Sequence, residues 1–344
     1  MTNFNIDFCT DAIEPMFRWL KKYKDTGVRK ESELLDVLEL HDYSVEFLRY
    51  GDNSLPVCGI SKAEAVDFFM NFDNKDFDNP RLAAKKPSFW KFFDSLDERI
   101  KLLDVFSSLT KQDEEQIKLL LKNSVPNDLL NNLDLKIILI ISIGNSMGWP
   151  YGEYLDFDVA NLDQIESKEA FVRVIAHEIH HICFNHLLED NGNIRPSNYF
   201  QVAFAFEGLA VHYCNNAKTK LKPSKYDDEV LGMQTQDMQL YESEFDLLFE
   251  KFKTDLHKTS IATDFEQPLE VLKEYEKFTY TSLKDGTEHA IYQYPTYFLG
   301  CYFWGSIDIA FGMEKVYAVL NNPDQFVETY NQAAIKLGNT NYLL

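Results

Sequence analysis

Apolar residues in the first part of the chain recur every three or four positions, in short runs separated by polar turns. Such spacing predicts amphipathic helices. The clearest helix start is Ser61-Lys62-Ala63-Glu64, a capping-box pattern that satisfies the first backbone N–H groups of a helix. We read residues 1–134 as a helical N-terminal region. Its helices are expected at 11–24, after Ser61, from Ser88 and at 110–123, with an Asn- and Asp-rich linker at 71–81.

The pattern changes at Leu135. Residues 136–143 form a run rich in β-branched side chains, which predicts a buried strand, and 153–159 predicts a second strand after a turn-prone loop at 144–152. The fold class is therefore mostly α with a small β-sheet, an α+β arrangement. We assign 135–344 to a catalytic region, which could form one integrated unit with the N-terminal region. Its helices are expected at 167–190, 198–215, 235–255, 269–278, 295–311 and 323–337, with Gly312 ending the fifth.

Composition fits a folded protein with an acidic surface. The 344 residues are 45% hydrophobic and 14% aromatic, which excludes a disordered chain. The chain carries 34 Lys and Arg against 55 Asp and Glu, a formal charge of −21. Such a surface repels phosphate backbones and anionic lipids, so we expect neither a nucleic-acid nor a membrane partner.

The cysteines and the first residues favour a cytoplasmic protein. Residues 1–20 lack the apolar core and basic flank of a signal peptide, and the longest apolar run, 137–143, is too short to cross a bilayer. The odd number of widely spaced cysteines, without a CxxC pair, does not form a disulfide framework. These cysteines are Cys9, Cys58, Cys183, Cys214 and Cys301.

The predicted helix at 167–190 contains three of the eight histidines within five residues. His177-Glu178-Ile179-His180-His181 includes the pattern HExxH. Residues four apart project from one helix face about 6 Å apart, so His177 and His181 can bind one cation. Glu178 is rotated by about 100° and lies beside the metal, where it can accept a proton from a bound water. His180 could also pair with His177, but only the pair with His181 leaves Glu178 in a useful position.

A catalytic zinc site has three protein ligands and leaves one position open. A third histidine in the spacing HExxHxxGxxH is excluded, because Phe184 and Leu187 occupy the required positions and His186 is one residue out of register. Glu207 is the only acidic residue between Ser197 and Lys218, on a helix that is otherwise apolar. A lone carboxylate in such a helix favours a bound cation over an exposed surface position. Gly208 beside it would let this helix and the helix that carries HExxH approach closely.

HExxH followed after about 25 residues by Glu-Gly-x-Ala resembles the gluzincin-type metallopeptidases, and more closely the uncharacterised bacterial families named as zinc-dependent peptidases. The resemblance covers residues 137–312 and includes Phe206-Glu207-Gly208-Leu209-Ala210, the loop Gly148-Trp149-Pro150-Tyr151 and the segment 294–300. It implies a Zn²⁺ site of His177, His181 and Glu207 with Glu178 as the general base. It also implies an upstream strand whose edge holds an extended peptide beside the metal, a place that 153–159 would fill.

Two features depart from that pattern or leave a choice open. Thermolysin-like relatives carry an Asp four residues after the Glu ligand that orients a histidine; Val211 stands there, and Asp156 or Asp158 could supply this bond. Such peptidases also stabilise the oxyanion with a Tyr or His, and we choose Tyr297, which opens a predicted helix. The other candidates are Tyr292, Tyr294, Tyr302 and His289.

The sequence thus predicts a zinc-dependent peptidase that hydrolyses amide bonds in a peptide or protein substrate. Two alternatives stay open: a processing protease specific for one protein partner, and a non-catalytic binding module stabilised by zinc. Metal analysis together with digestion of a peptide library would separate the three. The sequence does not distinguish an aminopeptidase from an endopeptidase, nor does it give the oligomeric state.

Overall fold

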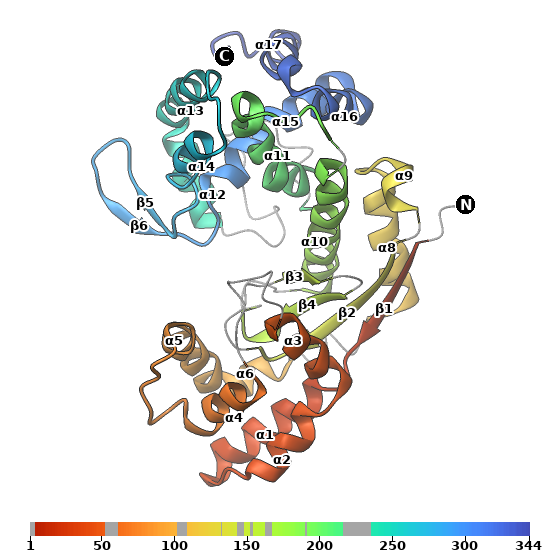
Figure 1. Cartoon of the computed structure of the whole chain (residues 1–344), viewed down its shortest axis with the longest axis vertical. Coiled ribbons are helices and arrows are strands. Elements are labelled where there is room, and N and C mark those ends of the chain that lie inside the picture. Colours follow the sequence, from red (N-terminus) through yellow and green to blue (C-terminus); the bar gives the residue numbers. More distant parts are fainter. Residues whose placement is uncertain are drawn as a thin grey trace. The chain divides into compact units, whose positions relative to one another are not determined.

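The computed structural model describes residues 4–51, 61–101, 109–131, 133–142, 148–151, 154–161, 167–189, 191–215 and 235–344. The chain forms two compact units (Figure 1). The first contains residues 3–116 and 132–168, and the second contains 117–131 and 169–344. The sequence-based division into a helical region at 1–134 and a catalytic region at 135–344 was drawn by expected function, and it stays a prediction. No helix within the described ranges is long and apolar enough to cross a membrane.

The first unit is built on a four-stranded sheet with the order β1-β2-β4-β3. β1 and β4 run parallel to β2 on either side of it, and β3 pairs antiparallel with β4. Ile137 to Ile141 are fully buried, as the β-branched run predicts. The strands are β1 (Asn5–Cys9), β2 (Asp134–Ile140), β3 (Gly148–Tyr151) and β4 (Tyr154–Asp158).

Three expectations for this sheet were wrong. β1 lies in the region expected to be wholly helical, because five residues acquire strand geometry only by pairing with β2. Part of the expected loop, Gly148–Tyr151, is the strand β3. β4 is paired on both sides, so 153–159 does not offer an edge to a peptide; β3 and β1 are the outer strands. Residues 143–147, 152 and 153 of the two predictions lie outside the described part of the chain.

Helices pack beside this sheet and around an aromatic core. The capping box at Ser61 is present, and α4 begins at Lys62 as expected. Phe68, Phe72 and Phe89 pack against one another at centroid distances of 4.9 to 6.3 Å, with Phe89 edge-to-face on the other two rings. The helix expected from Ser88 instead begins at Pro80 and continues through Pro87. The elements are α1 (Ile13–Thr26), α2 (Glu31–Leu38), α3 (His41–Gly51), α4 (Lys62–Asn71), α5 (Pro80–Asp94), α6 (Leu96–Arg99) and η1 (Val159–Asn161); α8 (Lys111–Lys122) extends from this unit into the second.

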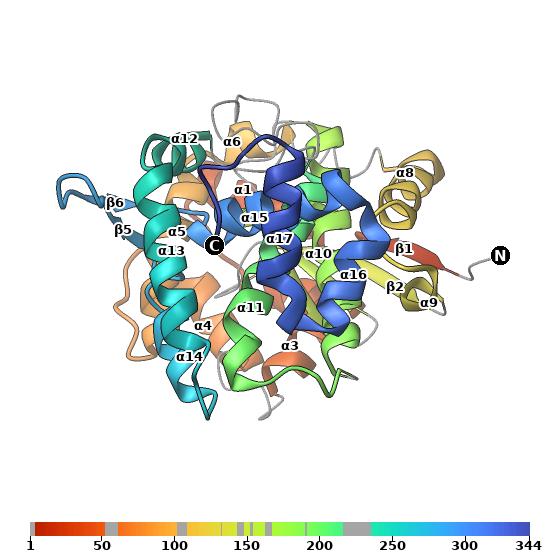
Figure 2. The ribbon, with the colours of Figure 1, turned by 90° about the horizontal axis from the view of Figure 1, so that it is seen from above.

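The second unit is helical, with α11 and α15 packed along one another at its centre (Figure 1). α13, α16 and α17 surround this pair (Figure 2), and a β-hairpin projects beside α12 and α14. The elements are α9 (Asn127–Leu130), α10 (Lys168–Glu189), α11 (Pro196–Cys214), α12 (Thr235–Ser243), α13 (Phe245–Thr259), α14 (Glu266–Leu272), β5 (Thr279–Thr281), β6 (Glu288–Ala290), α15 (Pro295–Phe311), α16 (Met313–Asn321), η4 (Pro323–Gln325) and α17 (Phe326–Lys336).

The helices that carry the predicted chemistry, α10, α11 and α15, agree with the sequence to within two residues, whereas the segments between α11 and α15 do not. The helix expected at 235–255 breaks at Glu244, whose carboxylate accepts hydrogen bonds from Tyr280, Ser282 and the Leu283 amide. The helix expected at 269–278 ends at Leu272 and is followed by the hairpin. Gly312 ends α15 as expected, with α16 beginning directly after it.

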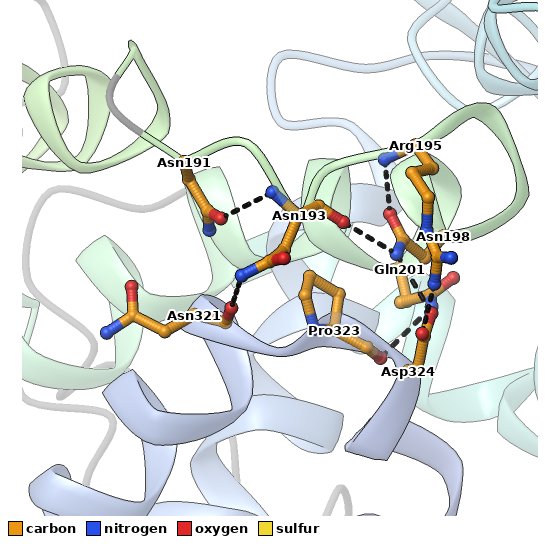
Figure 3. A network of polar contacts seen from close by, with 8 residues as sticks. All are labelled: Asn191, Asn193, Arg195, Asn198, Gln201, Asn321, Pro323 and Asp324. Carbon is orange, nitrogen blue, oxygen red and sulfur yellow. Dashed lines mark hydrogen bonds and ion pairs between the residues drawn. The ribbon is translucent and has the colours of Figure 1, made fainter.

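A polar network fixes the turn between α10 and α11 (Figure 3). The buried Asn198 caps the start of α11 by accepting from the Arg195 amide at 2.8 Å, and its own amide donates to Asp324 at 3.0 Å. Arg195 also forms an ion pair with Asp324. Asn193 donates to the Asn321 carbonyl at 2.8 Å. The turn is therefore held against the segment that joins α16 to η4.

Two glycines allow α11 and α15 to touch backbone to backbone. A Cβ on Gly208 would lie 2.5 Å from the amide nitrogen of Cys301 and closer still to Gly300. A Cβ on Gly300 would in turn collide with the Phe204 carbonyl. Since real Cβ atoms do not approach so closely, only glycine fits either position. Gly208 thus permits a close approach of α11 to α15, whereas the sequence suggested a close approach of α11 to the HExxH helix, α10. The contact with α15 fixes the backbone next to Glu207.

Candidate metal centre

Three predicted ligand residues meet between α10 and α11. The Nε2 atoms of His177 and His181 lie 3.0 Å apart, and both face Oε2 of Glu207, at 3.3 and 3.2 Å. The two histidines are buried, and the Glu207 side chain is 19% exposed. Among the described residues, these three have side chains placed so that they could hold one metal ion together, and we refer to them as the metal group. The i, i+4 spacing and the lone acid of α11 therefore converge as the sequence indicates.

The size of this triangle fits zinc. Tetrahedral Zn²⁺ with ligand bonds of about 2.0–2.1 Å holds neighbouring ligand atoms about 3.3 Å apart. The three separations of 3.0, 3.2 and 3.3 Å match that edge length. Two imidazole nitrogens and one carboxylate oxygen also form a common donor set of catalytic zinc sites. Two facing Nε2 atoms repel one another unless a proton or a cation lies between them, so the arrangement fits a bound ion.

Asn215 orients His177. The Nδ1–H group of His177 donates a 2.7 Å hydrogen bond to Oδ1 of Asn215, which leaves the Nε2 lone pair directed at the other two ligands. The sequence expected Asp156 or Asp158 in this role. Asp158 instead binds Lys85 at 2.7 Å and accepts from the amides of Ser142 and Ala160, which occupies both of its oxygens. For His177 the partner is therefore Asn215 rather than either of these carboxylates.

Packing fixes the plane of the second imidazole. The His181 ring stacks on Phe206 with a centroid distance of 4.0 Å and an interplanar angle of 10°. Its Nδ1 atom has no hydrogen-bond partner among the residues that the structure describes. His180 is fully buried between Phe184 and Tyr213, and burial lowers its pKa well below the usual value. His180 thus packs as a neutral side chain, which agrees with its exclusion as a ligand.

Glu207 stays ionised although it is surrounded by protein. Burial alone would raise its pKa, but the charges and hydrogen bonds of His181 and His177 outweigh this effect and lower the pKa below its usual range. A carboxylate kept charged in this way contributes one negative charge to the group. That charge complements the double charge of a zinc ion.

Glu178 belongs to α10, as do the two histidines. It lies beside the three candidate ligands and is partly exposed. Burial and the nearby Glu207 carboxylate raise its pKa, against the opposite effect of His181 and His177. Its carboxylate makes no hydrogen bond or ion pair with any described residue. The group is therefore free to accept a proton, as expected for a general base.

Tyr297 is the predicted tyrosine that reaches the ligands. Its ring lies parallel to His177, with a centroid distance of 6.2 Å and an interplanar angle of 12°. Burial and the negative charge of Glu207 raise its pKa well above the usual value. The hydroxyl hence remains a donor at any physiological pH.

The other oxyanion candidates lie further away. Tyr294 contacts Tyr297 at 6.2 Å between ring centroids, and Tyr292 is 58% exposed. Tyr302 is buried against Phe245, and His289 lies in β6.

One known family matches the chain over a range that includes this site. Residues 74–339, more than three quarters of the chain, match the family described as "Putative zinc dependent peptidase (DUF5700)", and the chain belongs to that family. The matched range contains every residue of the metal group, together with Glu178, Asn215 and Tyr297. Neither a curated protein nor a solved structure matches the chain.

Proposed function

We propose that the chain is a zinc-dependent peptidase, with His177, His181 and Glu207 as the ligands and Glu178 as the general base. The observation that carries this proposal is the triangle of ligand atoms at tetrahedral spacing, with an unpaired, partly exposed carboxylate next to it. The family description names the same metal and the same reaction class.

The protein groups around the triangle divide the work of amide hydrolysis. A bound zinc ion would polarise the peptide carbonyl and activate water for attack. Glu178 accepts one proton from the water, whose oxygen bonds to the carbonyl carbon. When the C–N bond breaks, Glu178 returns that proton to the leaving amine, so no proton is gained or lost. Its position beside the candidate ligands, without a hydrogen bond or ion pair to any described residue, suits both halves of this transfer.

Tyr297 is suited to stabilise the negative charge that develops on the carbonyl oxygen. Its phenol remains protonated because burial and Glu207 raise its pKa. The parallel packing against His177 holds the ring beside the ligands. A hydroxyl donor held in place before the reaction stabilises an oxyanion better than mobile water does.

Replacing the general base without losing the metal tests the proposal. Glu178→Gln should retain zinc after dialysis and lose about 10²- to 10⁴-fold in the rate of peptide cleavage. Glu189→Gln is the matched control, because Glu189 is exposed near the end of the same helix. Zinc content is measured by elemental analysis, and cleavage by digestion of a peptide library. Undiminished cleavage by a zinc-loaded Glu178→Gln protein would refute the mechanism.

The same two measurements separate the alternatives. Zinc with cleavage of many peptides supports a general peptidase, whereas zinc with cleavage of a single protein supports a processing protease. Zinc without any cleavage, in the wild type as in Glu178→Gln, would leave a binding module in which Glu178 has no catalytic role.

A further inference from the structure

One face of α11 leads away from the metal group and stays partly open to solvent. Tyr199, Ala203, Phe206 and Glu207 are partly exposed, while the neighbouring residues of α11 from Phe200 to Gly208 are buried. At about 100° of rotation per residue, these four positions fall within an arc of about 100°, so they form one stripe along the helix. A peptide bound at the metal group, which includes Glu207, can therefore extend along this stripe.

Aromatic rings continue from the metal group to the edge of the same unit. The Tyr297 ring, parallel to His177, contacts Tyr294 at 6.2 Å, and Tyr294 contacts Phe278 at 5.2 Å. Phe278 is 71% exposed. The series of rings therefore runs from the metal group to a solvent-exposed side chain.

Glu276 adds a carboxylate to this aromatic surface. It is exposed, two residues before Phe278, and has no hydrogen bond or ion pair with the described residues. The lysines nearest in sequence are already engaged, Lys273 with Glu270 and Lys277 with Glu274. Partial desolvation by the surrounding protein and the charge of Glu207 raise the pKa of Glu276 even though its side chain is exposed. Glu276 in turn helps to raise the pKa values of Tyr199 and Tyr294. The charge of Glu276 therefore influences Tyr199, at the start of the open stripe, and Tyr294, in the aromatic series that ends at Phe278.

We infer that Glu276, Phe278 and Tyr294 form a specificity site for a basic side chain, preferably arginine, of the bound peptide. A guanidinium stacks on aromatic faces and binds a carboxylate with two hydrogen bonds. This inference rests on the proposed function, because the site selects the peptide that is presented to the metal.

The chain already uses the same combination internally. Arg29 lies 3.7 Å from the Tyr23 ring centroid and 4.6 Å from that of Phe72, and donates to Asp73 at 2.8 Å. The same kinds of group, two aromatic rings and a carboxylate, occur at Tyr294, Phe278 and Glu276. No arginine of the described chain contacts these three side chains. The formal charge of −21 also favours a cationic peptide over an anionic one.

The test compares peptides that differ only in the charge of one side chain. Labelled peptides with arginine or its neutral isostere citrulline, each with a free or an acetylated amino terminus, are bound to the zinc-loaded, full-length Glu178→Gln protein. Fluorescence anisotropy gives Kd without turnover. The arginine peptides should bind about tenfold more tightly than the citrulline peptides. Glu276→Gln should abolish this preference, and Phe278→Ala should reduce it.

Glu288→Gln is the control, because it removes one exposed negative charge from the neighbouring strand β6 and should leave the preference unchanged. A preference that survives in Glu276→Gln would overturn the inference. So would the absence of peptide binding, or binding that depends on the free amino terminus rather than on the arginine.

Turnover by the wild-type protein separates this inference from the proposed function. Cleavage of arginine and citrulline peptides with equal kcat/KM and equal Kd would overturn the specificity site and leave the peptidase intact. Binding of arginine peptides through Glu276 without cleavage by the zinc-loaded wild type would support the specificity site and refute the peptidase.

Discussion

Gly208→Ala is the sharpest single test of how the fold positions the metal group. The methyl group would lie 2.5 Å from the Cys301 amide nitrogen and closer to the backbone of Gly300. Ordinary van der Waals contact begins at 3.4 Å, so α11 and α15 must separate by 3.4 − 2.5, about 0.9 Å, or more. No side-chain rotation can relieve the collision, because the atoms on the other side belong to a helix backbone.

The expected loss is large. Overpacking in a core typically destabilises by about 1–3 kcal/mol, and a collision between two backbones belongs at the upper end or beyond it. We expect Gly208→Ala to lower the free energy of unfolding by about 3 kcal/mol or more. Glu207 is the neighbouring residue and moves with α11, so zinc affinity should fall as well, by about tenfold.

Denaturant unfolding and competition with a zinc chelator measure the two effects separately. Gly192→Ala is the matched control, because a Cβ on Gly192 meets no atom within 4 Å and the residue lies in the turn before α11. Its stability should remain within about 0.5 kcal/mol of the wild type. A Gly208→Ala protein with wild-type stability and zinc affinity would refute the argument that close helix approach positions Glu207.

Two further predictions follow from buried hydrogen bonds. Asn215→Leu removes the acceptor for His177 Nδ1–H and should weaken zinc binding about 10- to 100-fold in chelator competition. Asn215→Asp keeps an acceptor oxygen and should restore the affinity. Wild-type zinc affinity in the Leu variant would contradict the role of Asn215 in orienting His177. Burial acts to raise the pKa of Glu244, but hydrogen bonds from Ser282, Tyr280 and the Leu283 amide outweigh it and lower the pKa. The contribution of Glu244 to stability is therefore present above the unfolded pKa of about 4.5, and it is lost as pH falls through the lower folded value. Glu244→Gln should therefore lower the free energy of unfolding by about 2 kcal/mol near neutral pH and by less near pH 3; an equal loss at both pH values would contradict this account.

Local signals in the sequence predicted the helices that carry the site. The capping box at Ser61, the stop at Gly312 and the apolar face around His177 each depend on residues within one helix. The sequence failed where distant contacts decide the backbone. The helix break at Glu244 depends on donors 36 to 39 residues away, and β1 depends on a strand that begins at Asp134.

The candidate site shows the same division. The pair His177 and His181 was predictable because its spacing lies within one helix, and Glu207 because a lone carboxylate is conspicuous in an apolar helix. Glu276 and Phe278 were not, since residues 269–278 were expected to continue as a helix. Only the turn that follows Leu272 brings them towards Tyr294.

Val211 stands where the resemblance expects an Asp that orients a histidine, yet His177 still has a hydrogen-bond partner, Asn215. α10 and α11 run antiparallel: His181 faces Glu207, and four residues earlier His177 faces the end of α11. A partner for His177 must then lie further along α11 than Glu207, at one or two helical turns, because each turn takes 3.6 residues. Val211, at the first turn, is fully buried, whereas Asn215, at the second, has the required acceptor. The hydrogen bond that fixes the tautomer thus lies one turn further along α11, and an Asn that looks like an ordinary helix end in the sequence supports a histidine of the candidate metal centre.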